Sequence, residues 1–444
     1  MKQKIIKYSI TFFVLVFTFC ISLTLASLIP KKAIEKNIKI SSNILLDERE
    51  DDGFFRRTIY LKLKRLIFDN DADAVMINNS ISIDTNHPFY SAMMVRRNYL
   101  SEKTKKIIPD KTGELLSSSK YKEYDPILEL RDTVNNDITE SFEYARYWHG
   151  YLIIVRPLLI ILNLNQIRIL FTILLIILGI ILLYKIYKEF GISMALIFIS
   201  GMIVCDYYYV GLSLQGVFIF LITTVATLML FSKKIKEKKY IFFLSGILAC
   251  FFDFLTVPII SLCIPLTIYI LFIQKNKELN NKKLYLLITE LIIIWAIAYF
   301  GTWFAKWIIV DIIYNKNMIY LGFRQFIYRS IADTNISYVT LLKQILYVIR
   351  IPFVFAIFGT LIFTEISEMK KVNNKEQTQY KLRDRISVSL PYLIITIIPI
   401  VWYVVLKEHS YYHYFFTYRN FFAITISLCI FINKLLKKSE NNGR

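Results

Sequence analysis

The chain has 444 residues, of which 55% are hydrophobic and 16% aromatic, while only 20% are charged. Lys and Arg number 54 against 34 Asp and Glu, which gives a formal net charge of +20. This composition excludes a soluble globular protein, a disordered chain, a collagen-like fibre and a disulfide scaffold. Apolar runs long enough to cross a bilayer recur between residues 9 and 434, which predicts an all-α polytopic membrane protein.

The positive charge lies in short clusters between the apolar runs. Residues 30–150 hold 20 basic and 20 acidic residues, so this polar stretch is neutral overall. The rest of the chain holds 34 basic and 14 acidic residues. Basic clusters beside apolar runs are the positive-inside pattern of membrane proteins, so orientation explains the charge. Nucleic-acid binding is not expected, because it needs a basic face on a folded domain.

The N-terminal part of the chain divides into an anchor and a loop. Residues 9–28 form an apolar run of about 20 residues, long enough to span, so we predict that residues 1–29 are a retained signal anchor with a cytoplasmic N-terminus. Residues 30–166 then form a large external loop of mixed structure. The apolar segment 151–163 is interrupted by Arg156 and Pro157, which favours an interfacial helix over a span.

Residues 167–435 are predicted to form a multi-helix transmembrane domain, followed by a cytoplasmic tail at 436–444. Two long apolar stretches in it each run between basic clusters, so each must cross an even number of times. Each is predicted to be a helical hairpin with one aspartate, Asp206 or Asp253, at its external tip. About ten transmembrane helices with both termini cytoplasmic result, drawn from residues 9–28, 167–184, 192–231, 241–273, 285–307, 342–363, 388–406 and 420–435.

Several charged residues in these predicted spans require a partner. An aspartate next to hydrocarbon is costly unless it is paired, so Asp206 and Asp253 are either structural ion-pair members or functional residues. Arg350 lies well inside its predicted span, where it needs an aspartate or a lipid phosphate.

Two segments rich in aromatic residues and histidine are predicted to be external. The first, residues 144–150, leads through His149 into Arg156, and it is either an aromatic-belt anchor or a platform lining a site. The second, residues 408–419, holds His409, His413 and Arg419. Its histidines are four apart and could form a metal pair, but a third ligand is missing. Hydrogen bonding to a phosphate or sugar and a plain polar belt are the other interpretations.

An acidic segment lies in the predicted loop. Asp69, Asp71 and Asp73 have the alternate spacing of a calcium loop, but Ala74 and Ser80 stand where an EF-hand needs Gly and Glu. A solvated surface, a looser cation site and a catalytic base are the interpretations that remain. No metal site is assigned and no cofactor is expected, although a divalent cation stays open.

The order of these features resembles the GT-C superfamily of integral-membrane glycosyltransferases. A first span precedes a large external loop, Trp148-x-Gly150 and then Arg156-Pro157 lead into the next span, and many spans with lone outward acids follow. The resemblance implies transfer of a sugar from a polyprenyl-phosphate carrier to an envelope glycan or protein acceptor, at the outer face of the cell membrane. This chain departs from the superfamily because no acid follows the first span immediately.

The resemblance also implies roles for individual residues. An acid of the first external loop would serve as the catalytic base, for which the candidates are Asp71, Asp73 and Asp69, with Asp206 in reserve. Basic and polar side chains would hold the lipid phosphate and the substrate, and the candidates are Arg350, Arg419, His409, His413, Asp253, His149 and Arg156.

Two other classes of protein fit the same residues. A secondary transporter would need charges at mid-membrane and repeated halves, and the two adjacent aspartate hairpins are a faint repeat. A non-enzymatic envelope polymer assembly protein would need no catalytic base. Binding to polyprenyl-phosphate sugar analogues would separate a glycosyltransferase from a transporter, which is expected to show no dependence on the lipid.

Overall fold

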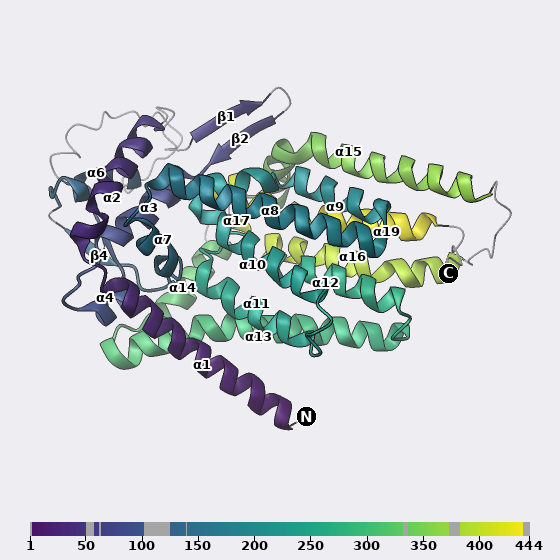
Figure 1. The fold of residues 1–444 in the computed structure, drawn as a ribbon, viewed down its shortest axis with the longest axis horizontal. Coiled ribbons are helices and arrows are strands. Elements are labelled where there is room, and N and C mark those ends of the chain that lie inside the picture. Colours follow the sequence, from purple (N-terminus) through teal and green to yellow (C-terminus); the bar gives the residue numbers. More distant parts are fainter. Residues whose placement is uncertain are drawn as a thin grey trace.

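A computed structural model describes residues 2–49, 57–61, 64–101, 125–138, 140–331, 336–372 and 382–437. Long helices form a bundle, and a group of shorter elements, which we name the cap, lies at one end of it (Figure 1). The first and last described parts of the chain lie away from the cap. The cap comprises α2 (Lys31–Asp47), β1 (Arg57–Leu61), β2 (Lys64–Phe68), α3 (Asn70–Ile81), α4 (Pro88–Met94), β3 (Arg96–Asn98), α6 (Pro126–Val134), β4 (Ser141–Glu143) and α7 (Leu152–Leu158).

The bundle identifies the chain as a helical membrane protein. Seven described stretches are helical, long and apolar enough to cross a bilayer. They lie in α1 (Lys2–Ser27), α8 (Leu164–Phe190), α9 (Ile192–Val204) with η1 (Tyr207–Leu212), α13 (Asn281–Tyr314), α15 (Tyr338–Val372), α16 (Leu382–Val405), and α18 (Tyr414–Thr417) with η2 (Tyr418–Asn420) and α19 (Phe421–Leu436). Three further apolar helices are shorter: α10 (Leu214–Leu230), α11 (Lys239–Phe252) and α12 (Ile260–Lys275). Two amphipathic or polar helices, α14 (Met318–Ile331) and α17 (Lys407–Tyr412), complete the set.

Apolar side chains cover the outside of the bundle. Phe13 of α1, Ile180 of α8 and Phe355 of α15 are 69%, 62% and 71% exposed. Such surfaces are stable where lipid covers them, since lipid provides no hydrogen bonds but accepts apolar side chains. By contrast, α19 is almost wholly buried and packs against α16, α9 and α15. The bundle is therefore built around α19, with α1, α8 and α15 at its periphery.

Local sequence explains where the first long bundle helix after the cap begins. The side chain of Asn163 accepts a hydrogen bond from the Gln166 backbone at 3.2 Å, and Gln166 Oε1 accepts one from the Asn163 backbone at 2.9 Å. This capping box satisfies two amides that the first turn of α8 would otherwise leave unpaired. Ser41 of α2 accepts a further hydrogen bond from the Leu164 amide at 2.9 Å, so the same turn is fastened to the cap.

The two predicted aspartate tips lie at helix junctions at the capped end. Asp206 lies between α9 and η1, and Asp253 lies between α11 and α12. Both limbs of the first predicted hairpin pack against α8, but their other partners differ, because α9 contacts α19 and α15 whereas α10 contacts α12 and α11. Gly211 of η1 approaches Thr172 of α8 so closely that a Cβ atom would lie 2.5 Å from the Thr172 backbone. This close approach holds the tip inside the bundle.

The cap has its own core and its own ion pairs. Helix α3 packs against α6 and α2, and α4 packs against α1. Two antiparallel pairs of strands, β1 with β2 and β3 with β4, complete it. Arg97 Nη2 lies 3.3 Å from Glu129 Oε2, and Arg49 Nη2 lies 3.1 Å from Asp125 Oδ2. These contacts hold the cap together over the end of the bundle.

Candidate functional site at the capped end

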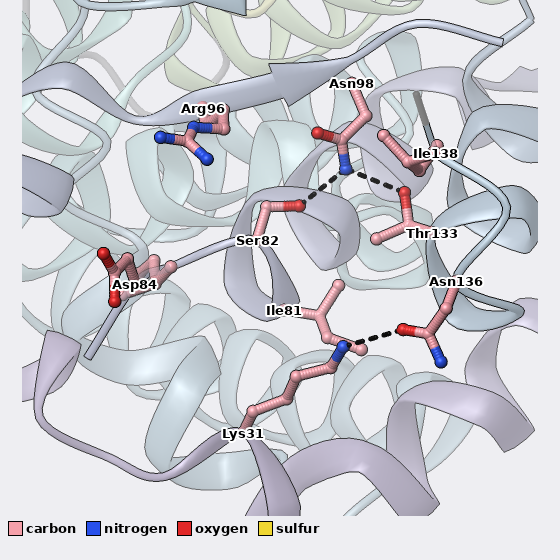
Figure 2. A pocket seen from close by; sticks show the side chains of 10 residues that line it. Lys31, Ile81, Ser82, Asp84, Arg96, Asn98, Thr133, Asn136 and Ile138 are labelled. Atoms are coloured by element: carbon pink, nitrogen blue, oxygen red, sulfur yellow. Dashed lines mark hydrogen bonds between the residues drawn. The ribbon is translucent and has the colours of Figure 1, made fainter. Parts of the chain in front are cut away.

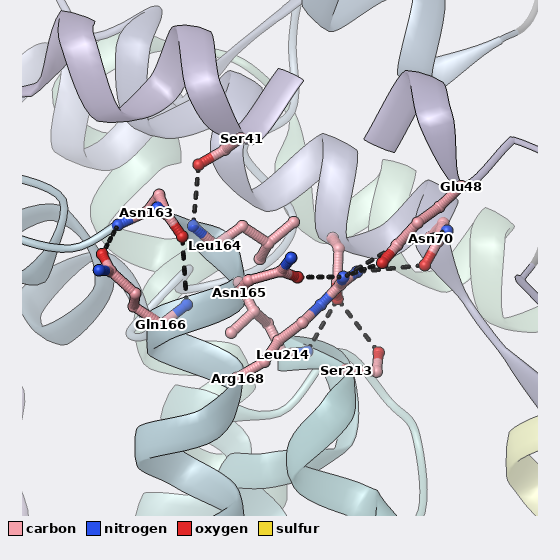
Figure 3. Close-up of polar contacts among 11 residues, drawn as sticks. Ser41, Glu48, Asn70, Asn163, Leu164, Asn165, Gln166, Arg168, Ser213 and Leu214 are labelled. Carbon is pink, nitrogen blue, oxygen red and sulfur yellow. Dashed lines mark hydrogen bonds and ion pairs between the residues drawn. The ribbon is translucent and has the colours of Figure 1, made fainter. Parts of the chain in front are cut away.

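A buried ion-pair network fastens the cap to α8 and α10 (Figure 3). Arg168 of α8 is 2% exposed, and its Nη2 and Nε atoms lie 2.8 and 3.0 Å from Asp73 Oδ2. Its Nη1 atom lies 2.9 Å from Glu48 Oε2, and its Nη2 atom also donates to Asn70 at 3.1 Å. Every arm of the guanidinium therefore has an acceptor.

The other oxygen of the Asp73 carboxylate is also occupied. Oδ1 accepts hydrogen bonds from the Ser213 hydroxyl at 3.1 Å and the Leu214 amide at 2.8 Å. The Leu214 amide is at the first residue of α10, where the helix dipole favours a negative charge. Asp73 is fully buried, and both of its oxygens face protein donors. This carboxylate is arranged to position α3, α8 and α10.

The two neighbouring acids of the predicted base segment are less buried. Asp69 caps the N-terminus of α3 by accepting a hydrogen bond from the Ala72 amide at 3.0 Å. Asp71 lies in the first turn of the same helix and is half-buried. The three acids, which the sequence presents as one cluster, thus occupy three different environments.

Asp206, the reserve candidate, lies beside residues of the last loop. Its backbone is left-handed, with φ 55°, and its side chain is 1% exposed. Oδ2 accepts a hydrogen bond from the Tyr418 hydroxyl at 2.6 Å. The structure therefore brings a residue of the α9–η1 junction next to η2, 212 positions later in the chain.

Arg419 is the next residue of η2 and has no polar partner among the residues that the structure describes. Its side chain is 6% exposed, its Nε atom is buried without an acceptor, and its guanidinium lies 5.3 Å from the centre of the Tyr418 ring. Nη1 lies beside Gly216, in the first turn of α10, where an added Cβ atom would be 4.0 Å from it. A buried guanidinium without an anion costs several kcal/mol, so Arg419 is a candidate for binding an anionic ligand.

The aromatic segment before α7 is buried between the cap and the bundle. Trp148 Nε1 donates to the Thr302 carbonyl at 2.8 Å, and the Gly150 amide donates to the Phe251 carbonyl at 3.0 Å. His149 Nε2 donates to the Tyr144 carbonyl at 2.8 Å. Burial lowers the pKa of His149 to about 3, so this imidazole is neutral at physiological pH.

His409 joins three segments at the same end of the bundle. Its Nδ1 accepts from Arg329 Nη1 of α14 at 3.2 Å, and its Nε2 donates to the Leu255 carbonyl at 2.8 Å. Burial, with His413 and Arg329 nearby, lowers the pKa of His409 well below its ordinary value. The His413 ring lies 4.8 Å away, as the spacing of four predicts. Both ring nitrogens of His409 are engaged, and no three His, Cys, Asp or Glu side chains gather into a metal site anywhere in the described chain.

Asp253 is held locally, two residues before Leu255. Its carboxylate accepts hydrogen bonds from the Thr256 amide at 2.8 Å and from the Thr256 hydroxyl. Burial raises the pKa of Asp253 to about 7. The carboxylate shapes the turn that presents the Leu255 carbonyl to His409.

A second concentration of positive charge lies beside His409. Arg146 donates to Gln325 of α14 at 3.1 Å and stacks over the Tyr144 and Tyr147 rings at 4.8 and 5.5 Å. Although burial acts to raise it, the guanidinium groups of Arg146, Arg97 and Arg329 leave the pKa of Tyr144 below its ordinary value. Of these three arginines, Arg97 has a carboxylate partner in Glu129.

The remaining two predicted residues lie in different surroundings. Arg156 is fully buried and donates to the carbonyls of Ser80 at 3.0 Å and Ile29, so it fastens the end of α3 to the chain after α1. Arg350 lies on the exposed side of α15, with its guanidinium 5.4 Å from the centre of the Tyr347 ring. Neither shares the environment of Arg419.

Sequence reasoning missed Arg168, Arg146, Arg329 and Tyr418. Arg168 had a usable signal, because it lies just inside a predicted span, the property that drew attention to Arg350. Arg146, Arg329 and Tyr418 lie in segments that the sequence marks only as polar or aromatic, and their partners are distant in sequence. No family model, curated protein or solved structure matches the chain.

Proposed function

We propose that this chain is a membrane glycosyltransferase that transfers a sugar from a polyprenyl-phosphate carrier to an envelope acceptor. The observation that carries the proposal is Arg419, a cation buried at the capped end of a lipid-facing bundle and without an anion among the described residues. A guanidinium binds the phosphate oxygens of a departing carrier through two parallel hydrogen bonds. Lipid-exposed helices around the site would admit the carrier tail.

The reaction needs one base and one anion-binding group. The base takes the proton of the acceptor hydroxyl, the acceptor oxygen bonds to the anomeric carbon, and the bond from that carbon to the phosphate oxygen breaks. The bonding electrons leave with the carrier as polyprenyl phosphate, whose added negative charge Arg419 offsets. No redox partner is required.

We assign the base to Asp206, with Asp71 as the alternative. Asp206 accepts a hydrogen bond from Tyr418, whose ring lies beside the Arg419 guanidinium, and this shared contact with Tyr418 supports placing both residues in one site. Asp73 is a positioning residue in this proposal, since both of its oxygens face protein donors.

The proposed topology has ten crossings, from the seven long stretches and α10, α11 and α12, with the cap outside and both termini in the cytoplasm. Tyr208 is 40% exposed at the capped end, and Lys282 is exposed in the first turn of α13. A cysteine replacing Tyr208 should react with a membrane-impermeant thiol reagent in intact cells. A cysteine replacing Lys282 should react only after permeabilisation. The reverse pattern would overturn the orientation and the site with it.

Activity is tested with purified protein in vesicles that contain a polyprenyl-phosphate sugar. Release of polyprenyl phosphate should depend on an acceptor and should be lost in Arg419→Leu. Arg324→Leu is the matched control, because Arg324 is an exposed arginine of α14. Sugar movement across the bilayer without cleavage would favour a transporter. Carrier binding without turnover in any acceptor mixture would favour a polymer assembly protein.

A further inference from the structure

A cavity of about 300 Å³ opens on the cap, separate from the site at Arg419 (Figure 2). It lies where the start of α2, the end of α3, strand β3 and the end of α6 meet. This volume is at the lower end of the roughly 300–1,000 Å³ that ligand pockets occupy, so the cavity suits a ligand of about one sugar residue. None of the predicted site residues lines it.

The polar groups of the cavity wall are held in place by one another. Asn98 is 5% exposed and donates to the Ser82 hydroxyl at 3.0 Å and the Thr133 hydroxyl at 2.9 Å. Its Oδ1 atom accepts no hydrogen bond from the part of the chain that the structure describes. Lys31 Nζ donates to Asn136 Oδ1 at 3.3 Å. The wall is therefore preorganised, with an acceptor that a hydroxyl group of a ligand can use.

The charges of the wall leave a positive excess. Lys31 and Arg96 approach the cavity from α2 and β3, as Figure 2 shows, and neither forms an ion pair within the described chain. Asp84 is the carboxylate of the wall, and it accepts from the His87 ring and the Asn86 amide, both at 2.9 Å. Asp84 is thus engaged by His87 and Asn86 and interacts with Arg96 only through longer-range electrostatics, so both cations can still bind an anionic group.

Apolar and polar lining occur together in this cavity. Ile81, Ile83 and Ile138 contribute apolar surface beside the amides and cations. A pyranose ring has the matching chemistry, with C–H faces and a rim of hydroxyl groups. A carboxylate on the ring would pair with the two cations. We propose that this cavity binds an acidic sugar residue of a glycan, and that it holds the acceptor of the proposed transfer.

The part of this inference that concerns the acceptor rests on the proposed function, so the experiment measures binding without the lipid donor. The full chain in detergent micelles is titrated with a uronate-containing oligosaccharide and with the same oligosaccharide after reduction of its carboxyl groups. Calorimetry should show saturable binding of the first and at least about tenfold weaker binding of the second. Arg96→Ala and Lys31→Ala should each weaken uronate binding about tenfold, because each loses a charge-assisted hydrogen bond.

Two controls separate this inference from the proposed catalytic site. Lys36→Ala removes an exposed lysine from the same helix as Lys31 and should leave the affinity unchanged. Arg419→Leu should also bind the uronate oligosaccharide normally, even if it has lost transfer. Equal binding of the reduced oligosaccharide, or full affinity in both Arg96→Ala and Lys31→Ala, would overturn the proposed cavity ligand. If Arg419→Leu lost transfer but bound the uronate oligosaccharide normally, the defect would lie in the catalytic site, and the proposed cavity ligand would be supported.

Discussion

Arg168 and Arg419 are both buried at the capped end of the bundle, yet their surroundings are opposite. Arg168 meets Asp73, Glu48 and Asn70, and each arm of its guanidinium has an acceptor. Arg419 has an aromatic neighbour and no acceptor among the described residues. The comparison separates Arg168, which connects structural elements, from Arg419, which we propose binds the carrier phosphate. Burial alone does not distinguish them, because they are 2% and 6% exposed.

The same substitution at the two arginines should therefore have different effects on stability. Arg168→Leu leaves Asp73 and Glu48 buried without their cation, which should reduce the free energy of unfolding by about 3–5 kcal/mol. Arg419→Leu removes an uncompensated charge and should change it by less than about 1 kcal/mol, or increase it. Thermal unfolding of both variants in the same detergent, followed by tryptophan fluorescence, measures the difference. Equal destabilisation by both substitutions would contradict the distinction.

The acids beside the two arginines should differ in their effect on turnover. A positioned general base contributes about 10²–10⁴-fold, so Asp206→Asn should reduce sugar transfer by that factor while the protein folds normally. Asp73→Asn should act mainly through stability, because it disturbs the Arg168 network. The measurement is the initial rate of transfer in vesicles at equal amounts of folded protein. If Asp71→Asn abolished transfer and Asp206→Asn did not, the base would belong to α3.

Binding of the donor phosphate should depend on the planar shape of the Arg419 guanidinium as well as on its positive charge. Arg419→Lys keeps a cation but loses the planar fork that binds two phosphate oxygens. The half-saturating donor concentration should rise about tenfold, with a smaller change in the maximal rate. Donor titration of transfer in vesicles checks this, and Arg324→Lys is the control. An unchanged half-saturating concentration in Arg419→Lys would argue against bidentate binding.

In the cap, the buried carboxyl group of Glu129 should make a smaller contribution to stability, and this contribution should depend on pH. Burial raises the pKa of Glu129 to about 7 despite its pairing with Arg97. The pKa of Glu129 is higher in the folded state than in the unfolded state, so the folded state favours the protonated carboxyl group. The contribution of Glu129 to stability is therefore complete below about pH 4.5 and is lost as the pH rises through 7. Glu129→Gln should therefore be more stable than wild type at pH 8, by about 1–3 kcal/mol, with little difference at pH 4.5.

Hydrogen exchange of the α6 amides at pH 4.5, 6 and 8 measures this change locally. Thr133, one turn beyond Glu129, belongs to the same helix and reports on it directly. A variant less stable than wild type at every pH would show that the ion pair with Arg97 outweighs the cost of burying the carboxylate.

The helical membrane character could be predicted from the sequence because its evidence is local. Apolar runs and the basic clusters between them are readable without knowledge of any partner. The apolar segment interrupted by Arg156 and Pro157 contains the short helix α7, and the two aspartate tips do lie at helix junctions. Beyond their shared contact with α8, α9 and α10 pack on different helices, and this could not be read from sequence because both limbs are apolar on several faces.

The arrangement of the site depends on contacts between distant residues, and it was correspondingly harder to predict. Asp69, Asp71 and Asp73 look equivalent in sequence, but Asp73 is the one whose position meets Arg168 and the first turn of α10. Asp206 and Tyr418 are 212 residues apart, so their hydrogen bond has no sequence signal. Arg419 was identified by residue type, and its lack of a partner among the described residues could be seen only in three dimensions.

Ligand-induced stabilisation is the sharpest test of the role given to Arg419. Wild type and Arg419→Leu are unfolded thermally with a short-chain polyprenyl phosphate, with the matching polyprenol, and with neither. A ligand at 100 times its dissociation constant stabilises the folded state by about 2.7 kcal/mol, so the phosphate should raise the unfolding temperature of wild type clearly. We expect no such rise for Arg419→Leu, and none with the polyprenol for either protein. Equal stabilisation of both proteins by the phosphate would contradict a carrier phosphate bound at Arg419.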